Sequence, residues 1–384
     1  MTRTWLVSLL SDQMVPNILL ARQLMRDGVE IDRHLLVSTQ IMEQRRKGEI
    51  YRDLVGVAEE DVNILEVDHK GVGSVFGKLG DMAFSEEDHF LVNLTGGTKM
   101  MSMGAFKWFS TRNHVLFYYL PMGSPDAYRL DNQTVERKEK LPITVRLSVK
   151  EYLNSYGVSI ISENIPDPPL VDWMNNNLPL LWEVSKDRES AVMAELGRMR
   201  DDVSQLKKKS LPLEKSGELT SWLDKRAFPL SRKDENRITK EEIKFLTGDW
   251  LEVLVAGQVR DAHPDLAKDE IMCGVQIQRD DANNELDVIY MLNNAPRVIE
   301  CKTLLEREYF DDTVYKLSTL RNSFGLTAKS AIVALHLGQN LLEKDRSRIR
   351  DTRLDRLKSL SIRFVHTPSP DMVSLRQHIA NWKK

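Results

Sequence analysis

The chain has 384 residues and a formal net charge of −3 at pH 7, with 41% hydrophobic and 29% charged residues. This length is sufficient for two or three globular domains. A slightly acidic chain is not suited to coating nucleic acid, so any contact with DNA or RNA must come from a local basic surface. The only cysteines, Cys273 and Cys301, are too few for a disulfide framework or a cysteine-based zinc site.

No apolar run approaches the roughly 20 residues of a membrane-spanning helix. The N-terminal sequence MTRTWLVSLLSDQ has too short an apolar run for a signal peptide. Together with the low cysteine content, these features predict a cytoplasmic protein that has no membrane partner.

Residues 1–144 alternate predicted strands with predicted helices. Residues 4–10 (TWLVSLL) are a continuous apolar run, as expected of a strand buried on both faces, and a helical pattern follows over residues 15–26. Further strands are predicted at residues 34–37, 62–67, 90–93 and 115–120, and a hairpin at 126–139 with its turn at Asp131-Asn132. This order predicts a doubly wound α/β domain with a mostly parallel sheet, in which ligands bind beyond the carboxyl ends of the strands.

Polar residues follow three of these strands. Ser11, Asp12 and Gln13 follow the first strand, and Ser38 and Thr39 follow the second. After a later strand comes the most informative stretch, FLVNLTGGTKMMSM (residues 90–103), which leads through two glycines into a predicted helix.

In this stretch, Gly96 and Gly97 let the backbone approach a ligand closely, and the following helix offers free N–H groups to an anion. Thr95 and Thr98 can donate hydrogen bonds to a phosphate, and Lys99 can neutralise its charge. The pattern matches neither the phosphate loop of ATPases nor the dinucleotide-binding fingerprint. The alternative is a tight turn that needs glycine and is capped by Thr98.

The pattern N-x-T-G-G-T-K after a strand, in an α/β domain with an early Ser-Asp-Gln turn, resembles the CARF domain (CRISPR-associated Rossmann fold). The resemblance implies a homodimer that binds a cyclic oligoadenylate, most simply cyclic tetra-adenylate, across its two-fold axis as a second messenger of type III CRISPR systems. It implies contacts to the phosphates and riboses of the ring from Asn93, Thr95, Gly96, Gly97, Thr98 and Lys99. The residues expected to line the same pocket are Ser11, Asp12, Gln13, Ser38 and Thr39.

Residues 145–235 are predicted to connect two domains, mainly through helices. A helix is predicted over residues 145–156, ending at Gly157, and one long amphipathic helix over residues 178–208. The polar stretch 210–235 is predicted to be a linker, with a loop that contacts nucleic acid as the alternative.

Residues 236–384 are predicted to form the second domain, which opens with a helix that Thr239 caps. Beyond residue 303, helices are predicted at residues 309–323 and 341–358, strands at 330–337 and 362–365, and a closing helix from residue 371. Lys316 and Arg321 on the first of these helices could face a substrate. The order predicts a sheet between two layers of helices.

Between these helices, residues 274–303 predict three short strands, at 274–278, 286–292 and 297–302. Glu300 and Lys302 are two residues apart, so on a strand their side chains point to the same face. A turn at residues 293–296 brings Asp287 alongside them. The sequence therefore predicts that two carboxylates and an ammonium group meet on a largely apolar hairpin.

Two converging carboxylates repel each other and are costly to bury unless positive charge joins them. A divalent cation with oxygen ligands is the usual solution, and a lysine beside it can orient water and stabilise charge on a phosphate. The alternative is an exposed hairpin on which Glu300 and Lys302 form a solvated ion pair.

The sequence ELD, followed by a turn and then VIECK, resembles the PD-(D/E)xK nucleases, which have a restriction-endonuclease-like α/β/α fold. The resemblance implies a metal-dependent endonuclease, using Mn²⁺ or Mg²⁺, in which Asp287 and Glu300 bind the metal and Lys302 positions or activates water. Glu252, in GDWLE, matches the acidic residue that a preceding helix adds, although an ordinary exposed glutamate is the alternative. The backbone carbonyl of Cys301 is a further expected metal ligand.

Together the two resemblances imply a homodimeric effector of type III CRISPR antiviral defence, in which cyclic tetra-adenylate activates cleavage of DNA or RNA. Single-stranded DNA or RNA and nicked duplex DNA all stay open as substrates. The alternative is a regulator that senses the cyclic oligoadenylate and binds nucleic acid without cutting it. Asp287, Glu300 and Lys302 speak against that alternative, because a binding protein has no need for converging carboxylates.

Overall fold

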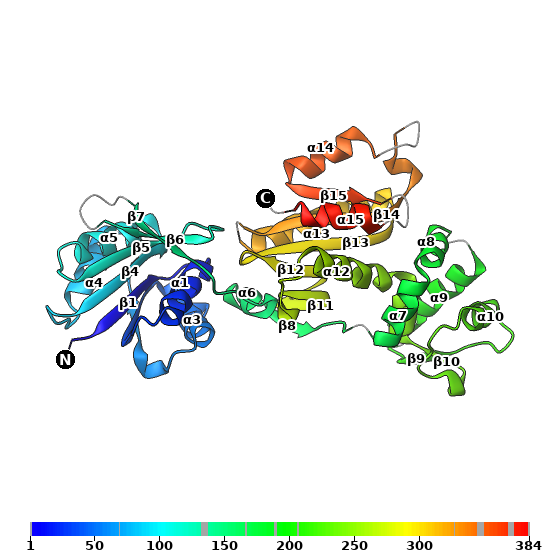
Figure 1. Cartoon of the computed structure of the whole chain (residues 1–384), viewed down its shortest axis with the longest axis horizontal. Helices are drawn as coiled ribbons and strands as arrows, with labels where there is room; N and C mark the ends of the chain where they lie inside the picture. Colours follow the sequence, from blue (N-terminus) through cyan, green and yellow to red (C-terminus); the bar gives the residue numbers. More distant parts are fainter. Residues whose placement is uncertain are drawn as a thin grey trace.

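The structure is a computed structural model, which describes residues 2–68, 70–131, 137–165, 167–187, 190–205, 207–325, 327–343, 349–367 and 372–382. Figure 1 shows an N-terminal α/β domain at one end, a C-terminal α/β domain in the middle and a mainly helical region at the other end. Among the described residues, no helix combines the length and the apolar character needed to cross a membrane.

The N-terminal domain is built on a seven-stranded sheet in the order β3-β2-β1-β4-β5-β6-β7. Its strands are β1 (Thr4–Leu9), β2 (Arg33–Ser38), β3 (Val62–Glu66), β4 (His89–Gly96), β5 (Val115–Tyr119), β6 (Asp126–Leu130) and β7 (Arg137–Pro142). The first five are parallel, and β6 and β7 add an antiparallel hairpin at one edge. The mostly parallel α/β sheet predicted from the sequence is confirmed. Asn132, half of the predicted hairpin turn, lies outside the described residues.

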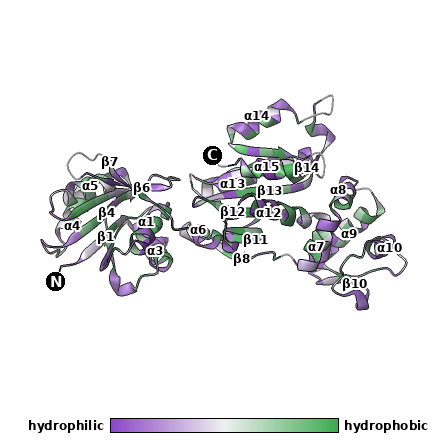
Figure 2. Ribbon diagram, viewed as in Figure 1, coloured by the Kyte–Doolittle hydropathy of each residue, from purple (hydrophilic) through white to green (hydrophobic). Residues whose placement is uncertain are grey.

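Helices cover both faces of this sheet, which explains why its strands are continuous apolar runs. They are α1 (Val15–Arg26), α2 (Gln40–Gln44), α3 (Lys47–Val55), α4 (Val72–Gly80) and α5 (Lys99–Phe109). Alternate residues of β1 point to opposite faces. Leu6 packs in a core with α1 and α3, whereas Val7 packs in a second core with α4 and α5. Figure 2 shows these inner strands as largely hydrophobic.

The strand order reverses at β1, which lies between β2 and β4. Crevices at such switch points, beyond the carboxyl ends of the strands, are where α/β sheets bind ligands. Leu9 at the end of β1 is in register with Gly96 at the end of β4. The fold therefore brings the Ser11–Gln13 turn and the glycine loop to one edge of the sheet.

The C-terminal domain contains a six-stranded sheet in the order β15-β14-β13-β12-β11-β8. Its strands are β8 (Ser159–Ser162), β11 (Ile271–Arg279), β12 (Ala282–Leu292), β13 (Ala295–Leu305), β14 (Lys329–Leu337) and β15 (Ile362–His366). Helices α12 (Trp250–Ala262) and α15 (Met372–Ala380) cover one face, and α13 (Arg307–Ser323) covers the other. The predicted α/β/α arrangement is confirmed, and the three central strands are longer than expected.

A mainly helical region precedes this domain and differs most from the prediction. It comprises α7 (Pro168–Asn176), α8 (Leu178–Lys186), α9 (Ala191–Gln205), β9 (Ser210–Pro212), α10 (Glu218–Lys225), β10 (Arg237–Thr239) and α11 (Lys240–Lys244). The prediction of one helix over residues 178–208 is wrong, because α8 ends at Lys186 and α9 is a separate helix. Trp182 of α8 and Leu196 of α9 nevertheless pack in the same core.

The predicted linker at residues 210–235 is also wrong. β9 pairs with β10, and α10 buries Leu219 and Leu223 in the core that α12 shares. The segment predicted to connect the domains also contributes β8, which pairs with β11 at the edge of the C-terminal sheet. Polar and charged residues together make up most of residues 210–235, and a few buried leucines are enough to fold the stretch against a neighbouring core.

The predicted helix at residues 341–358 is correct only in its second half. Helix α14 spans Asp351–Ser359, and Leu342 instead forms an isolated bridge with Ile349. Residues 344–348 of that predicted helix lie outside the described residues.

The short helix α6 (Val149–Ser155) lies between the two domains (Figure 1). It begins after the predicted start at residue 145, where Ser148 caps it, and Gly157 follows its end as expected. Lys47 of the N-terminal domain donates from Nζ to the carbonyl of Ser155, 2.8 Å away. On the other side, the hydroxyl of Tyr152 donates to the carbonyl of Phe324, 2.7 Å away. One helix thus contacts both domains.

We expect the buried His34 to make the N-terminal domain sensitive to acid. The side chain is 1% exposed, its Nδ1 lies 3.0 Å from the hydroxyl of Tyr51, and burial lowers the pKa of His34 to about 4. Between about pH 6.5 and pH 4 the unfolded chain therefore binds more protons than the folded one, and stability falls as the pH falls through this window. The expected loss is about 3 kcal/mol by pH 4.

Urea unfolding of the protein from pH 7.5 to pH 4.5 measures this effect. His34→Gln should flatten the dependence on pH, whereas His378→Gln, at an exposed position, should leave it unchanged. An equally steep decline in His34→Gln would show that other groups cause the acid sensitivity.

Candidate functional site

The β12–β13 hairpin carries the predicted acidic residues. Its turn is Asn293-Asn294, with φ of 53° and 57°, because Leu292 pairs with Ala295. Two successive residues with positive φ make the tight turn that matches the twist of two strands, and asparagine tolerates this conformation. The turn is shorter than the predicted four residues. Its register pairs Val288 with Ile299, so Asp287 and Glu300 come next to each other on adjacent strands.

The carboxylates of Asp287 and Glu300 are buried, with 6% and 3% of these residues exposed. Lys302 Nζ lies 2.7 Å from Glu300 Oε1 and 3.8 Å from Asp287 Oδ2. Lys316 of α13 mirrors it, with Nζ 2.6 Å from Glu300 Oε2 and 3.8 Å from Asp287 Oδ1. The backbone N–H of Cys301 donates to Asp287 Oδ2, 2.7 Å away. This is a buried cluster, so a solvated surface ion pair is excluded.

The surroundings disfavour negative charge on Asp287 and on Glu252 of α12. Burial, and after it the charge of Glu300, raises the pKa of Asp287 to about 6. Burial and the charge of Asp287 likewise raise the pKa of Glu252. Burial lowers the pKa of Lys302, but the two carboxylates outweigh it and the net shift is upward. The site thus brings three carboxyl groups together with two ammonium groups, and burial disfavours the charged form of two of the acids.

A polar cavity of about 250 Å³ opens onto this cluster. Glu252 of α12 lines it with Asp287, Glu300 and Lys302, so the structure brings together all four predicted catalytic residues. The further charged residues that line it are Arg200, Lys244, Asp249, Glu285 and Lys316.

Sequence reasoning named Lys316 only as a residue that could face a substrate, and it missed the other four. Asp249 lies three residues before Glu252, a spacing that places side chains on one side of a helix. Glu285 is two residues before Asp287, a spacing that shares one face of a strand. These two could have been found from spacing. Arg321, named with Lys316, instead donates to the backbone carbonyls of Ala328 and Leu360.

Carboxylate oxygens are the ligands that Mg²⁺ and Mn²⁺ prefer, so Glu252, Asp287 and Glu300 fit a hard divalent cation. In this arrangement the two lysine ammonium groups lie against the carboxylates. Within the described parts of the chain, no three histidine, cysteine or acidic side chains are placed to hold a metal. Binding one therefore requires the acids to turn from their lysines. Burial raises the pKa of the Cys301 thiol, and sulfur is a soft ligand that a hard cation does not prefer, so the expected ligand from Cys301 is still its backbone carbonyl.

At the switch point of the N-terminal sheet, Ser11, Asp12 and Gln13 after β1 are at least partly exposed, whereas Ser38 and Thr39 at the end of β2 are buried. Asp12 is exposed and pairs with Arg45, 2.5 Å away. Ser11 Oγ donates to the carbonyl of Gln13, 3.3 Å away. Ser38 Oγ donates to the carboxylate of Glu43, and Thr39 caps α2. These five residues lie at the edge where the sheet would bind a ligand.

Within the glycine loop, the structure gives Asn93 and Thr95 a role other than the expected contact with a ligand. Asn93 is fully buried, and its amide donates to Asn17 Oδ1 at 2.7 Å and accepts from the N–H of Thr95 at 3.0 Å. Thr95 Oγ1 accepts from the N–H of Leu120 at 2.7 Å. Both side chains hold the loop in place. Lys99, at the start of α5, is exposed, and Thr98 caps that helix, as the alternative interpretation of the loop expected.

Gly96 is required where it stands, and we expect Gly96→Ala to unfold the loop. Its φ is +97°, and a Cβ there would lie 2.5 Å from the carbonyl oxygen of Leu9. Backbone strain of this kind costs about 1–3 kcal/mol before the clash is counted. Thermal unfolding of Gly96→Ala should show a clear loss of stability. Gly73→Ala, in α4 with open space around it, should be neutral or slightly stabilising; equal effects would contradict this reasoning.

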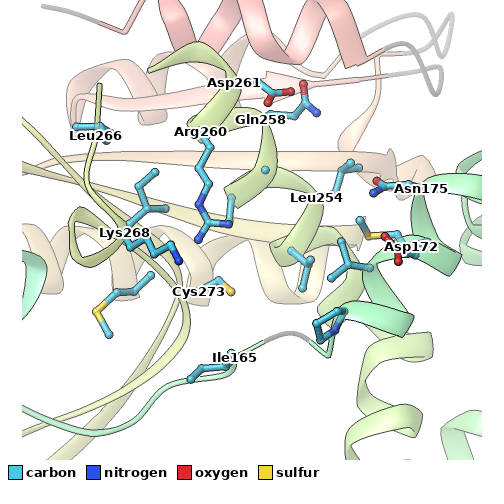
Figure 3. A pocket seen from close by; sticks show the side chains of 18 residues that line it. Ile165, Asp172, Asn175, Leu254, Gln258, Arg260, Asp261, Leu266, Lys268 and Cys273 are labelled. Carbon is cyan, nitrogen blue, oxygen red and sulfur yellow. The ribbon is translucent and has the colours of Figure 1, made fainter. Parts of the chain in front are cut away.

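A larger cavity of about 810 Å³ lies between α7, α12 and β11 (Figure 3). Its wall is mainly apolar, and the side chains of Arg260, Lys268 and Cys273 point into it. The Cys273 thiol donates to the carbonyl of Asn164, and burial raises its pKa to about 11, so it is not a nucleophile. None of the carboxylates of the smaller cavity lines this space. We therefore assign the chemistry to the smaller, polar cavity.

Comparison with known protein families identifies both ends of the chain. Residues 5–152 match the Card1 CARF domain, and residues 239–384 match the Card1-like endonuclease domain. Both domain types expected from the sequence are thereby confirmed. No protein with a curated description matches the sequence.

Solved structures share the fold over the full length. Can2 from Sulfobacillus thermosulfidooxidans, in complex with cyclic tetra-adenylate, is 22% identical with a TM-score of 0.68, covering 99% of both chains. Protein VC1899 from Vibrio cholerae is 18% identical with a TM-score of 0.72, covering 99% of this chain and 97% of that one. A type III CRISPR defence DNA nuclease activated by cyclic oligoadenylate is 18% identical, with a TM-score of 0.55, covering 94% of this chain and 52% of its own.

Proposed function

Because the chain belongs to the proteins that join a Card1 CARF domain to a Card1-like endonuclease domain, we propose that it is a nuclease of type III CRISPR defence that a cyclic oligoadenylate activates. The observation that carries this proposal is the cluster of Asp287, Glu300 and Lys302, which lies within the matched endonuclease domain. A buried site that gathers carboxyl groups with perturbed pKa values beside an ammonium group suits metal-dependent hydrolysis of a phosphodiester.

We propose Glu252, Asp287 and Glu300 as the ligands of a divalent cation, Mn²⁺ or Mg²⁺, which when bound would supply Lewis-acid activation of the scissile phosphate. Asp287 accepts from the N–H of Cys301 through Oδ2, so its Oδ1 would be the oxygen left for the cation. Lys302, released from Glu300, can donate to the attacking water and to the negative charge that develops on the phosphate. Lys316 lies on the opposite side of Glu300 and orients that carboxylate.

In the N-terminal domain, we propose that cyclic tetra-adenylate binds at the switch point between β1 and β4. The support is the place of Ser11–Gln13, Ser38 and Thr39 at this edge, together with the exposed Lys99 at the start of α5. Gly96, Gly97 and Thr98 would present backbone N–H groups to phosphates. A homodimer would bind the ring across its two-fold axis, and the cytoplasm is the expected compartment. Of the six loop residues, Asn93 and Thr95 would stabilise the loop through their hydrogen bonds to the surrounding protein.

The test is a cleavage assay with purified protein, Mn²⁺ and labelled single-stranded DNA, single-stranded RNA or nicked duplex DNA, with and without cyclic tetra-adenylate. Cleavage that needs both metal and messenger is the expected result, and the same gel identifies the substrate. Tight messenger binding and retention of nucleic acid without any cleavage would instead favour the non-cutting regulator. Failure to bind the messenger would overturn the assignment of the glycine loop.

A further inference from the structure

The polar cavity of about 250 Å³ is lined by two cationic side chains that are not among the predicted catalytic residues. Arg200 of α9 and Lys244 of α11 line it together with Asp287, Glu300 and Lys302. Lys302 and Lys316 each lie within 2.7 Å of a Glu300 oxygen. In the described chain, by contrast, no ion pair joins Arg200 or Lys244 to a carboxylate. Their positive charge is therefore available to something outside the protein.

Helix α9 is built to hold Arg200 in this position. Leu196 and Val203 of the same helix are buried in the core that includes Trp250 at the start of α12. Arg200 Nη1 donates to Thr247 Oγ1, 2.8 Å away, and Thr247 in turn donates to the carbonyl of Ile243. The guanidinium also lies beside Gly248, where an added Cβ would be 3.7 Å from Nη1. One hydrogen bond to a neutral hydroxyl thus fixes the guanidinium of Arg200 and leaves its other N–H groups for a ligand.

The charges of Arg200 and Lys244 act on Asp249, another residue that lines the cavity. Burial raises the pKa of Asp249, and the charges of Lys244 and Arg200 oppose that rise. Arg200 and Lys244 line the same cavity as the acids that fit a cation, and this combination matches a nucleic-acid strand. The acids would hold the metal ion at the phosphate that reacts, and Arg200 and Lys244 would hold a neighbouring phosphate of the same strand.

We propose that Arg200, assisted by Lys244, binds a phosphate of the substrate strand next to the one that is cleaved. The inference rests on the proposed nuclease function and deepens it. Arg200 lies between the two ranges that match known domains, residues 5–152 and 239–384. The helical region is thus assigned a direct part in holding substrate, in addition to packing against the nuclease domain.

Substrate binding is measured by the anisotropy of a labelled single-stranded oligonucleotide with the Glu300→Gln protein, which holds the strand without cutting it, in Mn²⁺ and cyclic tetra-adenylate. Adding Arg200→Gln should weaken binding about tenfold at low salt and reduce the slope of log K against log salt by about 0.7, the value of one phosphate contact to a single strand. Arg200→Lys should restore the slope. Arg198→Gln, an exposed arginine of the same helix, removes the same charge and should change neither quantity.

With otherwise unaltered protein, Arg200→Gln should raise KM for cleavage far more than it lowers kcat, with Lys244→Gln showing a smaller effect. An unchanged salt slope in Arg200→Gln, or an equal loss in Arg198→Gln, would overturn the inference. A loss that is independent of salt, together with a lower unfolding temperature, would likewise overturn it, since that is the behaviour of a purely structural arginine. If the unaltered protein cuts nothing, the nuclease proposal itself fails, which is a separate result.

Discussion

Glu300→Gln and Lys302→Met are each expected to lower messenger-activated cleavage by about 10²–10³-fold or more. Glu300 accepts from Lys302 and Lys316 and is the central carboxylate of the cluster, so its neutral amide would lose both ion pairs and most of its affinity for a cation. Lys302→Met keeps an unbranched side chain of similar shape and removes the ammonium group that would donate to water and phosphate. Cleavage rates under single-turnover conditions measure both effects.

Messenger binding serves as the internal control for these two variants. The substitutions lie in the C-terminal domain, and the expected ligand site lies at the switch point of the N-terminal sheet, so affinity for cyclic tetra-adenylate should stay within about twofold of the unaltered protein. Glu308→Gln, at an exposed position at the start of α13, controls for the loss of a carboxylate. Cleavage within tenfold of normal in either Glu300→Gln or Lys302→Met would refute the assignment of the site.

Lys316→Met is expected to destabilise the metal-free protein and to make it respond more strongly to a divalent cation. Removing one ammonium leaves Asp287 and Glu300 with only Lys302 between them. Breaking a fully buried pair costs about 3–5 kcal/mol, and because the Lys316 side chain is 26% exposed we expect about 2 kcal/mol. Mn²⁺ should restore much of this loss, because a cation bound to the carboxylates replaces the missing charge.

The stability penalty of Lys316→Met should depend on pH in a direction that the pKa of Asp287 predicts. The pKa of Asp287 in the folded protein, about 6, lies above its value in an unfolded chain, so its contribution to stability is lost as the pH rises through about 6. The penalty of Lys316→Met without metal should therefore be larger at pH 8 than at pH 5. Chemical unfolding at both values, with and without Mn²⁺, measures this, and Lys358→Met is the control at a surface ion pair. Equal Mn²⁺ stabilisation of both variants would count against a cation at these carboxylates.

Local chemistry explains why the heart of the site could be predicted from sequence. Asn293-Asn294 forces a tight turn, and apolar β-branched residues on either side make both strands. Given the turn, the period of two in a strand leaves little freedom in where Asp287, Glu300 and Lys302 point. The parallel sheet of the N-terminal domain was predictable for a similar reason, since TWLVSLL and its counterparts are apolar on both faces.

Other predictions failed where packing between distant segments decides the outcome. Helices α8 and α9 are separate, and both place apolar side chains in the core around Trp250, a contact that the spacing within residues 178–208 does not specify. The polar stretch 210–235 folds because Leu219 and Leu223 find that same core. Asn93 follows a strand as a ligand-binding residue would, yet its amide meets Asn17, a residue 76 positions earlier in the chain.

The sequence by itself determined the two domain types and the hairpin that carries Asp287, Glu300 and Lys302, because turn chemistry, apolar runs and short spacings act between residues close along the chain. Only the tertiary structure decided that Lys316 faces Glu300, that Arg200 reaches the same cavity and that Asn93 points inward. These three placements depend on how α13, α9 and α1 pack against their sheets and cores. Such long-range packing is set by the burial of whole helix faces, which spacing within one segment does not specify.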